Sequence, residues 1–302
     1  MSFLPSVGVL ALALSSGVLA TIDTCPSDSP LSCSSSTTEA SCCYNSPGGS
    51  LLQTQFWDYD PSDGLSDSWT IHGLWPDNCD GTYQEYCDDA REYSNITEIL
   101  EAQGRTELLA YMQDYWPDYE GADEDETFWE HEWNKHGTCI NTIEPSCYTD
   151  YYAQEEVGDF FQQVVDLFKT LDSYGALANA SIVPSEDQTY ELSDIKDALA
   201  AIHGGYAPYI GCEDDALSEL YYYFNVKGSA IGGTYEPAES LEDSACPDSG
   251  IRYPPKYSSS SSSGSGSGSS GSSGKGGGSS GGSGHGGGRG GHYKRSQKNR
   301  LN

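Results

Sequence analysis

Two short segments of the chain concentrate the side chains that transfer protons. WTIHGLWPDN covers residues 69–78, and FWEHEWNKHGTC covers residues 128–139. Together they hold three of the six histidines, and two of the others lie in a glycine-rich C-terminal tail. Histidine accepts or donates a proton near its unperturbed pKa of about 6.5. Its association here with carboxylates, a lysine and tryptophans indicates acid–base chemistry on a charged substrate.

The spacing in the second segment argues against zinc, although HEWNKH resembles the HExxH motif. That motif places two histidines four residues apart on one helical face. His131 and His136 are five apart, which separates them by roughly 140° around an α-helix. The pairs that share a face are Glu132 with His136 and His131 with Lys135. We therefore expect no metal and no cofactor, and we expect Gly137 to end the helix as its C′ residue.

These groups suit phosphoryl transfer from a ribose 2′-hydroxyl. The reaction needs a base for the hydroxyl proton, an acid for the departing 5′-oxygen, and a cation for the charge that develops on phosphorus. The first segment supplies the missing half of such a site. A strand there places Thr70, His72 and Leu74 on one face and Trp69, Ile71 and Trp75 on the other. Trp75 and Asp77, which follow His72, can stack on and hydrogen-bond a nucleobase of single-stranded RNA.

The cysteines and the N-terminus indicate a secreted protein. Residues 1–20 are apolar, lack charged side chains and end in Val-Leu-Ala, as in a secretory signal peptide. The ten cysteines form no CxxC pair and predict disulfides. Their spacing leaves the pairing open. Sequons at Asn95 and Asn179 predict a glycoprotein.

Charge is distributed very unevenly. All 46 acidic residues and only eight of the 14 lysines and arginines lie in residues 21–257. Such a body repels a polyanion at neutral pH, which excludes steering of nucleic acid by a basic surface. Binding of RNA therefore requires a local cationic pocket or an acidic medium.

Residues 21–257 have the composition of one α+β domain. Apolar periodicity predicts helices over 152–171 and 193–205, the second capped by Ser193 or Asp194, with His203 structural at its end. Strands are predicted over 50–57, 68–75 and 220–228. Residues 258–302 are rich in serine and glycine and end in HYKRSQKNRLN. We expect a disordered, solvated tail; electrostatic contact with RNA, cell wall or the acidic body is the alternative.

The two histidine segments resemble the active-site segments of the ribonuclease T2 family, over roughly residues 25–255. The cysteines resemble those of its fungal branch. The resemblance implies a central antiparallel sheet flanked by helices and stabilised by disulfides. The implied pairs are Cys25–Cys43, Cys33–Cys79, Cys42–Cys147, Cys87–Cys139 and Cys212–Cys246.

The resemblance also implies roles for individual residues. His136 corresponds to the general base and His72 to the general acid, while Lys135 and Glu132 stabilise the phosphorane and His131 binds phosphate. The implied base-binding residues are Trp75, Asp77 and Tyr83 in a first base site, with Gln55 and Phe128 in a second.

The resulting hypothesis is a secreted, monomeric endoribonuclease with an acid pH optimum, with a vacuolar or lysosome-like compartment as the alternative location. It cleaves single-stranded RNA with low base specificity, through a 2′,3′-cyclic phosphate that is hydrolysed to a 3′-phosphate. We expect no membrane association and no obligate protein partner. Two other classes stay open. One is a toxin, effector or storage protein of the same family, and the other is a zinc peptidase.

Overall fold

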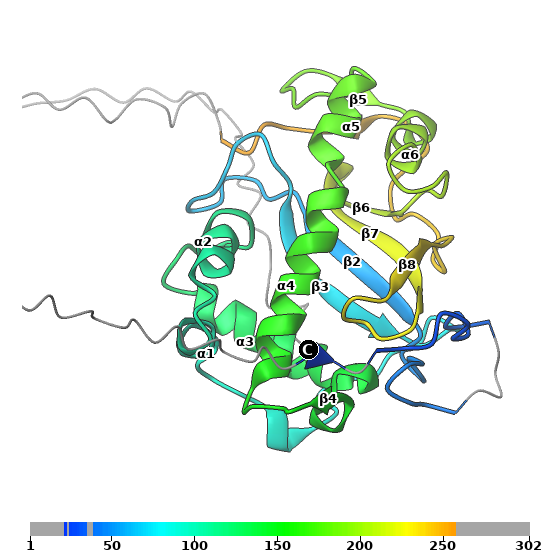
Figure 1. The fold of residues 1–302 in the computed structure, drawn as a ribbon. Coiled ribbons are helices and arrows are strands. Elements are labelled where there is room, and N and C mark those ends of the chain that lie inside the picture. Colours follow the sequence, from blue (N-terminus) through cyan, green and yellow to red (C-terminus); the bar gives the residue numbers. More distant parts are fainter. Residues whose placement is uncertain (1–20, 23, 35–38, 258–302) are drawn as a thin grey trace, which may run out of the picture.

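The computed structural model describes residues 21–22, 24–34 and 39–257; the expected signal peptide and the serine- and glycine-rich tail lie outside these residues. A seven-stranded sheet forms the centre of the fold (Figure 1). Its path is β3-β2-β7-β9-β5, and β6 and β8 also pair with β7. The strands are β2 (Ser50–Phe56), β3 (Thr70–Asp77), β5 (Thr189–Tyr190), β6 (Tyr209–Glu213), β7 (Ala216–Lys227), β8 (Thr234–Pro237) and β9 (Ile251–Arg252). A separate small sheet joins β1 (Thr21–Ile22) to β4 (Tyr148–Thr149).

The sheet is antiparallel except where β9 meets β7. Ala216 pairs with Arg252 in parallel, so the sheet is mixed rather than purely antiparallel as expected. The long pairings of β2 with β3 and β7 are antiparallel, in agreement with the prediction. The α+β class is confirmed.

Helices surround this sheet, and α4 crosses one of its faces (Figure 1). The helices are α1 (Ile96–Ala102), α2 (Thr106–Tyr115), α3 (Asp125–Lys135), α4 (Glu155–Thr170), α5 (Ser173–Asn179) and α6 (Leu192–Ala200). Four short 3-10 turns are η1 (Asp89–Arg91), η2 (Gly137–Cys139), η3 (Asn141–Ile143) and η4 (Pro145–Cys147). The apolar stripe of α4 is fully buried, which explains its clear sequence periodicity.

Helix starts differ from those predicted. The helix expected over 152–171 begins at Glu155, because Gln154 has a left-handed backbone with φ of +67°. The helix expected over 193–205 begins at Leu192, and Glu191 is its N-cap without a side-chain bond. Ser193 and Asp194 therefore do not cap it. His203 is buried, and its ring lies against Tyr222 and Phe224, consistent with a structural role.

A β-bulge at His72 changes which side chains share a face of the sheet. Thr54 pairs with Gly73 and Gln55 pairs with Ile71, so His72 is the extra residue. The bulge brings His72 to the same face as Trp75, and both line one pocket. The prediction of opposite faces was wrong, because simple alternation assumes an uninterrupted ladder.

All ten cysteines form disulfides, and the five pairs are those that the family resemblance implies. Cys33–Cys79 follows β3 directly, and Cys87–Cys139 follows α3 directly. The two histidine-bearing segments are thus tied to neighbouring chain at their C-terminal ends. Cross-links of this kind typically stabilise a fold by about 2–4 kcal/mol each.

Gly137 follows α3, but its backbone is not left-handed as a C′ glycine would be. His136 is the C-cap instead, and Gly137 opens the turn η2. A Cβ at Gly137 would lie 2.4 Å from the Trp133 ring. Glycine is needed here because an indole packs directly against the backbone.

Gly137→Ala should lower the free energy of unfolding by about 1–3 kcal/mol, the usual cost of overpacking a core. Urea denaturation measures the change. In a Trp133→Leu background, which removes the opposing ring, the same substitution should cost less than half as much. Equal costs in both backgrounds would contradict this explanation.

Candidate active site

A cavity of about 340 Å³ opens on the sheet face opposite α4. Seven of its lining residues are ones that the sequence singled out: His72, Trp75, Asp77, Tyr83, His131, Lys135 and His136. Five others were not anticipated: Leu52, Tyr209, Glu219, Tyr221 and Glu242. Strands β2, β3, β6 and β7 form its floor, and α3 supplies its ionisable wall.

Glu132 is the innermost ionisable group. It is completely buried, and it accepts a hydrogen bond from the Trp75 indole, with 3.0 Å between Nε1 and Oε2. Its other oxygen lies 3.3 Å from His72 Nε2. A Cβ at Gly73 would fall 1.9 Å from Glu132 Oε2. The missing side chain at Gly73 therefore lets the carboxyl of α3 reach the bulged strand.

Burial raises the pKa of Glu132 to about 8, and the Trp75 bond and the Lys135 charge only partly oppose it. The carboxyl is therefore protonated at acid and neutral pH. In that state it can donate a hydrogen bond, as a carboxylate cannot.

Trp75 lies between the two histidines that could transfer protons. Its ring centroid is 4.7 Å from His72, edge to face, and 4.9 Å from His136, stacked. Phe56 stacks on His72 at 3.8 Å, and the Phe128 ring is 5.7 Å away. These aromatic contacts fix the orientation of both imidazoles.

His136 is an uncharged base. Burial lowers its pKa well below 6.5, and the charges of Lys135 and His131 act in the same direction. His131 behaves similarly, because burial and then Lys135 lower its pKa to about 4. A neutral imidazole has the free lone pair that a general base requires.

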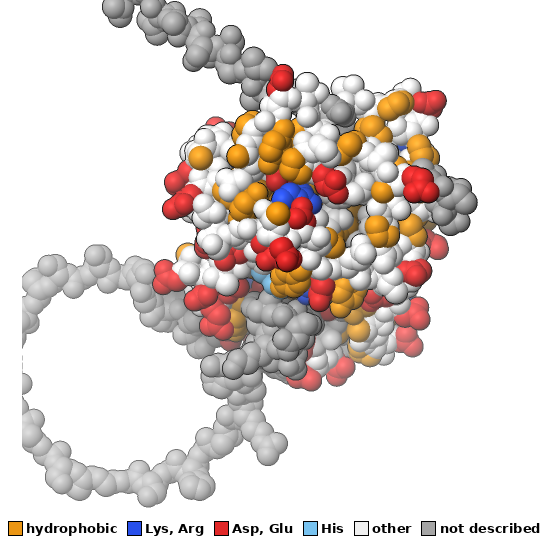
Figure 2. Space-filling view, turned by 90° about the horizontal axis from the view of Figure 1, so that it is seen from below, with side chains coloured by type: hydrophobic (Ala, Val, Ile, Leu, Met, Phe, Trp, Pro, Cys, Tyr) orange, Lys and Arg blue, Asp and Glu red, His pale blue; other side chains and the backbone are white. Residues whose placement is uncertain are grey.

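Lys135 is the only lysine or arginine among the residues that line the pocket. Its ammonium lies 3.7 Å from the Glu85 carboxylate, which is about half exposed. The adjacent Tyr86 hydroxyl is 3.5 Å from His131 Nδ1. The Lys135 ammonium has three donors, so it can bind an anion from the pocket beside the Glu85 carboxylate. Acidic side chains are spread over the face seen in Figure 2, and few lysines or arginines show among them. Lys135 therefore supplies local positive charge in a protein whose overall charge is strongly negative.

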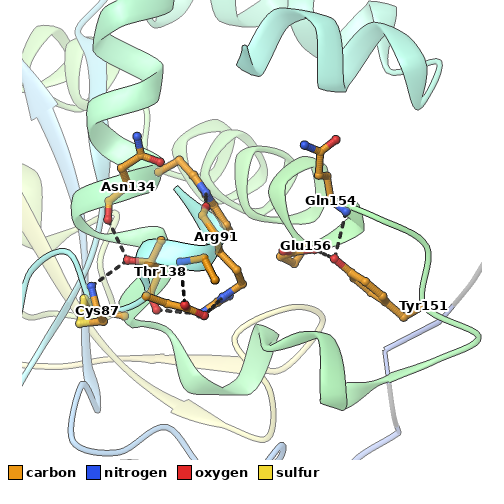
Figure 3. A network of polar contacts seen from close by, with 11 residues as sticks. Cys87, Arg91, Asn134, Thr138, Tyr151, Gln154 and Glu156 are labelled. Carbon is orange, nitrogen blue, oxygen red and sulfur yellow. Dashed lines mark hydrogen bonds and ion pairs between the residues drawn. A yellow bond between two sulfur atoms is a disulfide. The ribbon is translucent and has the colours of Figure 1, made fainter. Parts of the chain in front are cut away.

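A polar network fixes the end of α3 that carries these groups (Figure 3). Arg91 donates to the Thr138 carbonyl at 2.8 Å, and the Thr138 hydroxyl donates to the Asn134 carbonyl at 2.7 Å. The Cys87 amide donates to the same hydroxyl at 3.1 Å. Trp133 Nε1 donates to the Arg91 carbonyl at 2.7 Å. The segment after Tyr86 thus locks the C-terminus of α3 in place.

The arrangement offers a neutral imidazole, an ammonium and a second imidazole around one cavity, with the protonated Glu132 carboxyl buried next to them. This set can move a proton off one oxygen and onto another while stabilising an anion. His131, Glu132 and His136 also bring ligand atoms within 4.8 Å of one another, so these three residues could hold a metal ion.

A sequence model of the Ribonuclease T2 family matches residues 33–232. The chain belongs to the ribonuclease T2 family. It is an endoribonuclease of that family, and its substrate is RNA. No helix among the described residues has the length and apolarity to cross a membrane.

Two fungal relatives are similar over most of the chain. Ribonuclease M of Aspergillus phoenicis is 84% identical over 239 residues, which cover 79% of this chain and 100% of that protein. Ribonuclease T2 of Aspergillus oryzae is 62% identical over 259 residues, which cover 84% of this chain and 93% of that protein.

Two solved structures share the fold. The crystal structure of Actibind, described as a T2 ribonuclease, is 85% identical, with a TM-score of 0.77, and covers 79% of this chain and 100% of that one. RNase NT, solved in complex with 5′-AMP, is 25% identical, with a TM-score of 0.51, and covers 68% of this chain and 98% of that one.

Gln55 does not lie at the active-site pocket of this T2 ribonuclease. It is fully buried on the α4 side of the sheet, where its amide donates to the Leu171 carbonyl and accepts from Ser173. The prediction that Gln55 belongs to a second base site at this pocket was therefore wrong. Phe56, the next residue, is on the pocket side and contacts His72.

The other unforeseen lining residues come from distant parts of the chain. Tyr209 and Tyr221 pair across β6 and β7, and Glu219 accepts a hydrogen bond from the Tyr221 hydroxyl at 2.7 Å. Glu242 follows β8. The strand predicted over 220–228 overlaps β7, but no local sequence pattern in β7 indicates that it lines a pocket.

Glu132 should make the stability of this T2 ribonuclease fall with rising pH. The carboxyl ionises at about 8 in the folded protein and near 4.5 when exposed, so its stabilisation is full below 4.5 and is lost as pH rises through 8. Buried histidines act in the opposite direction, but only below 6.5. We expect the Glu132 contribution to the unfolding free energy to fall by about 2 kcal/mol between pH 6.5 and 8.

Urea denaturation at the two pH values measures this loss. Glu132→Gln should remove most of it, because an amide keeps the shape without the titration. Glu107→Gln, at an exposed position of α2, should leave it unchanged. A pH slope that is the same in all three proteins would contradict the prediction.

Proposed function

We propose that the enzyme is a secreted ribonuclease that cleaves single-stranded RNA by metal-independent transphosphorylation. The observation that carries this proposal is the neutral, buried His136 beside Lys135, with His72 on the far side of the Trp75 ring. Two proton-transfer groups, with a cationic group beside one of them, match the demands of in-line transfer at phosphorus.

In the first step, His136 takes the proton of the ribose 2′-hydroxyl, and the 2′-oxygen attacks the adjacent phosphorus. The bond from phosphorus to the 5′-oxygen breaks, and His72 gives its proton to that leaving oxygen. The products are a 2′,3′-cyclic phosphate and a free 5′-hydroxyl. In the slower second step, the two histidines exchange roles. Water attacks phosphorus while His72 takes a proton from it, the bond from phosphorus to the 2′-oxygen breaks, and His136 gives its proton to that oxygen, so that a 3′-phosphate forms.

Charge on the phosphorane is stabilised by Lys135 and Glu132. Lys135 supplies a full positive charge at the pocket. Glu132 carries a proton below pH 8, so it can donate a hydrogen bond to a non-bridging oxygen instead of repelling it. His131 lies one helical turn before Lys135 and completes the phosphate-binding wall.

An acid pH optimum follows from two features. Protonation of the acidic body lowers its repulsion of RNA. The leaving-group acid His72 must also carry a proton at the start of the first step.

The same proposal covers the compartment and the assembly. The N-terminal segment 1–20, the five disulfides and the sequons at Asn95 and Asn179 support a secreted glycoprotein, which we propose to be a monomer. Asn179 is exposed at the end of α5, and Asn95 is partly exposed before α1. Trp75, Asp77 and Tyr83 form the proposed first base site, and Phe128 contributes to the second.

A toxin or effector of the same family remains the second candidate function. The complete set of proton-transfer groups favours an active enzyme over an inactive storage protein. It is compatible with a signalling role that uses RNA cleavage.

His72→Phe and His136→Phe should each reduce RNA cleavage by about 10²- to 10⁴-fold, because each removes one proton-transfer group. Initial rates on single-stranded RNA at acid pH measure the loss. His203→Gln, a histidine on the opposite sheet face, should keep wild-type activity if it folds. Retention of more than about a tenth of the activity by either phenylalanine variant would contradict the assignment.

Cleavage should not depend on a divalent metal, even though His131, Glu132 and His136 lie within metal-binding reach of one another. Dialysis against EDTA should leave the rates on all sixteen dinucleoside phosphates unchanged, since two histidines and a lysine suffice for the chemistry. A loss that zinc restores would favour a metalloenzyme. Measurement from pH 4 to 8 should give a bell-shaped profile, and a maximum above pH 7.5 would contradict an acid optimum.

A further inference from the structure

Tyr86 has a backbone conformation that a tyrosine normally avoids. Its φ is +51°, in the left-handed region, and among the described residues no other aromatic side chain has such a backbone. The Cβ of an L-residue crowds the following carbonyl oxygen there, whereas glycine has no Cβ to crowd it. The side chain is also 44% exposed, so burial of its ring does not explain why a tyrosine stands here. Strain of this kind at an exposed position points to a role for the side chain.

The chain on both sides of Tyr86 is attached to the C-terminal end of α3. The Tyr86 amide donates to the Lys135 carbonyl at 3.1 Å. Before it, the Glu85 carboxylate lies 3.7 Å from the Lys135 ammonium. After it, Cys87 forms a disulfide with Cys139. The 85–87 segment therefore crosses the end of α3 at a fixed place, and these attachments impose the backbone conformation of Tyr86.

This conformation brings the Tyr86 hydroxyl to His131. The hydroxyl oxygen lies 3.5 Å from His131 Nδ1, and the two rings meet edge to face with their centroids 6.5 Å apart. A separation of 3.5 Å is long for a hydrogen bond, but contacts between active-site groups are commonly long in the free enzyme and tighten around the substrate. In the part of the chain that the structure describes, no other side chain lies within hydrogen-bonding distance of this imidazole.

The contact determines which nitrogen of His131 is left for a ligand. Because Nδ1 faces the tyrosine, Nε2 is the nitrogen available to an anion in the pocket that His131 and Lys135 both line. A hydroxyl can donate to a neutral imidazole and accept from a charged one. Tyr86 can therefore hold the ring in one orientation whichever protonation state His131 has. Hydrogen bonds of this kind commonly orient groups that bind a ligand through their other nitrogen.

We propose that Tyr86 is a positioning residue for phosphate binding. Its hydroxyl orients the His131 imidazole so that Nε2 meets the phosphate that Lys135 attracts. The inference rests on the proposed RNA cleavage at this site, in which His131 belongs to the phosphate-binding wall. It explains why the 85–87 segment carries a tyrosine at a point where glycine would fit the backbone without strain.

Tyr86→Phe keeps the ring and removes only the hydroxyl. In the full-length enzyme, the dissociation constant of 3′-AMP should rise by about three- to tenfold, as expected for one hydrogen bond. Quenching of tryptophan fluorescence measures it, since Trp75 lines the pocket. KM for the dinucleoside phosphate ApU should rise by the same factor, with kcat changed by less than about twofold, because the phosphate is bound both before and during the reaction. The urea midpoint of unfolding should stay at the wild-type value.

A second background tests whether the hydroxyl acts through His131. In His131→Ala, which removes the imidazole, adding Tyr86→Phe should leave the 3′-AMP dissociation constant unchanged, because the two groups act as one unit. Tyr206→Phe is the matched control. That tyrosine is 41% exposed and does not line the pocket, so its variant should bind 3′-AMP and cleave ApU as the wild type does.

Unchanged 3′-AMP binding and KM in Tyr86→Phe would overturn the inference and leave RNA cleavage standing. An equal loss of 3′-AMP binding in the wild-type and His131→Ala backgrounds would also overturn it, because the hydroxyl would then act on the ligand directly. A wild-type enzyme that binds 3′-AMP but does not cleave ApU would instead overturn the proposed function.

Discussion

The contact between the Glu132 carboxyl and the bulged strand at Gly73 is the constraint on which the site depends. Helix α3 and strand β3 meet here with no side chain between them, because a Cβ at Gly73 would overlap the carboxyl. The same contact brings Glu132 within 3.3 Å of His72 and within hydrogen-bonding distance of Trp75. Burying a carboxyl in this way is costly unless it takes up a proton. The raised pKa of Glu132 is the consequence.

The acidity of the whole protein opposes RNA binding, and the pocket offsets this locally with the positive charge of Lys135. A body with 46 acidic residues cannot attract RNA at long range at neutral pH. Lys135, which lies 3.7 Å from the Glu85 carboxylate, is the cation among the lining residues. Aromatic side chains also line the pocket, and such rings can bind bases by stacking, which does not depend on charge.

Rigidity of the site comes from contacts outside it. Cys87–Cys139 and the Arg91–Thr138 bond hold the end of α3, and Cys33–Cys79 holds the end of β3. On the other wall, Cys212–Cys246 holds the loop of Glu242. Catalytic groups must stay within a fraction of an ångström of their productive positions. The disulfides provide this in a protein whose long loops would otherwise leave the pocket walls free to move.

The sequence by itself determined the type of chemistry, the candidate residues on β3 and α3, the α+β class and the long amphipathic helix α4. Each of these is a local pattern: residue types at short spacing, or an apolar period. Tertiary structure alone decided the orientation of His72, because the bulge breaks strand alternation, and the position of Gln55, because that side chain faces α4. It also decided that Tyr209, Tyr221 and Glu242 join the pocket. These residues meet the histidines only through sheet pairing and a disulfide, which link positions far apart in the chain and leave no local trace in the sequence.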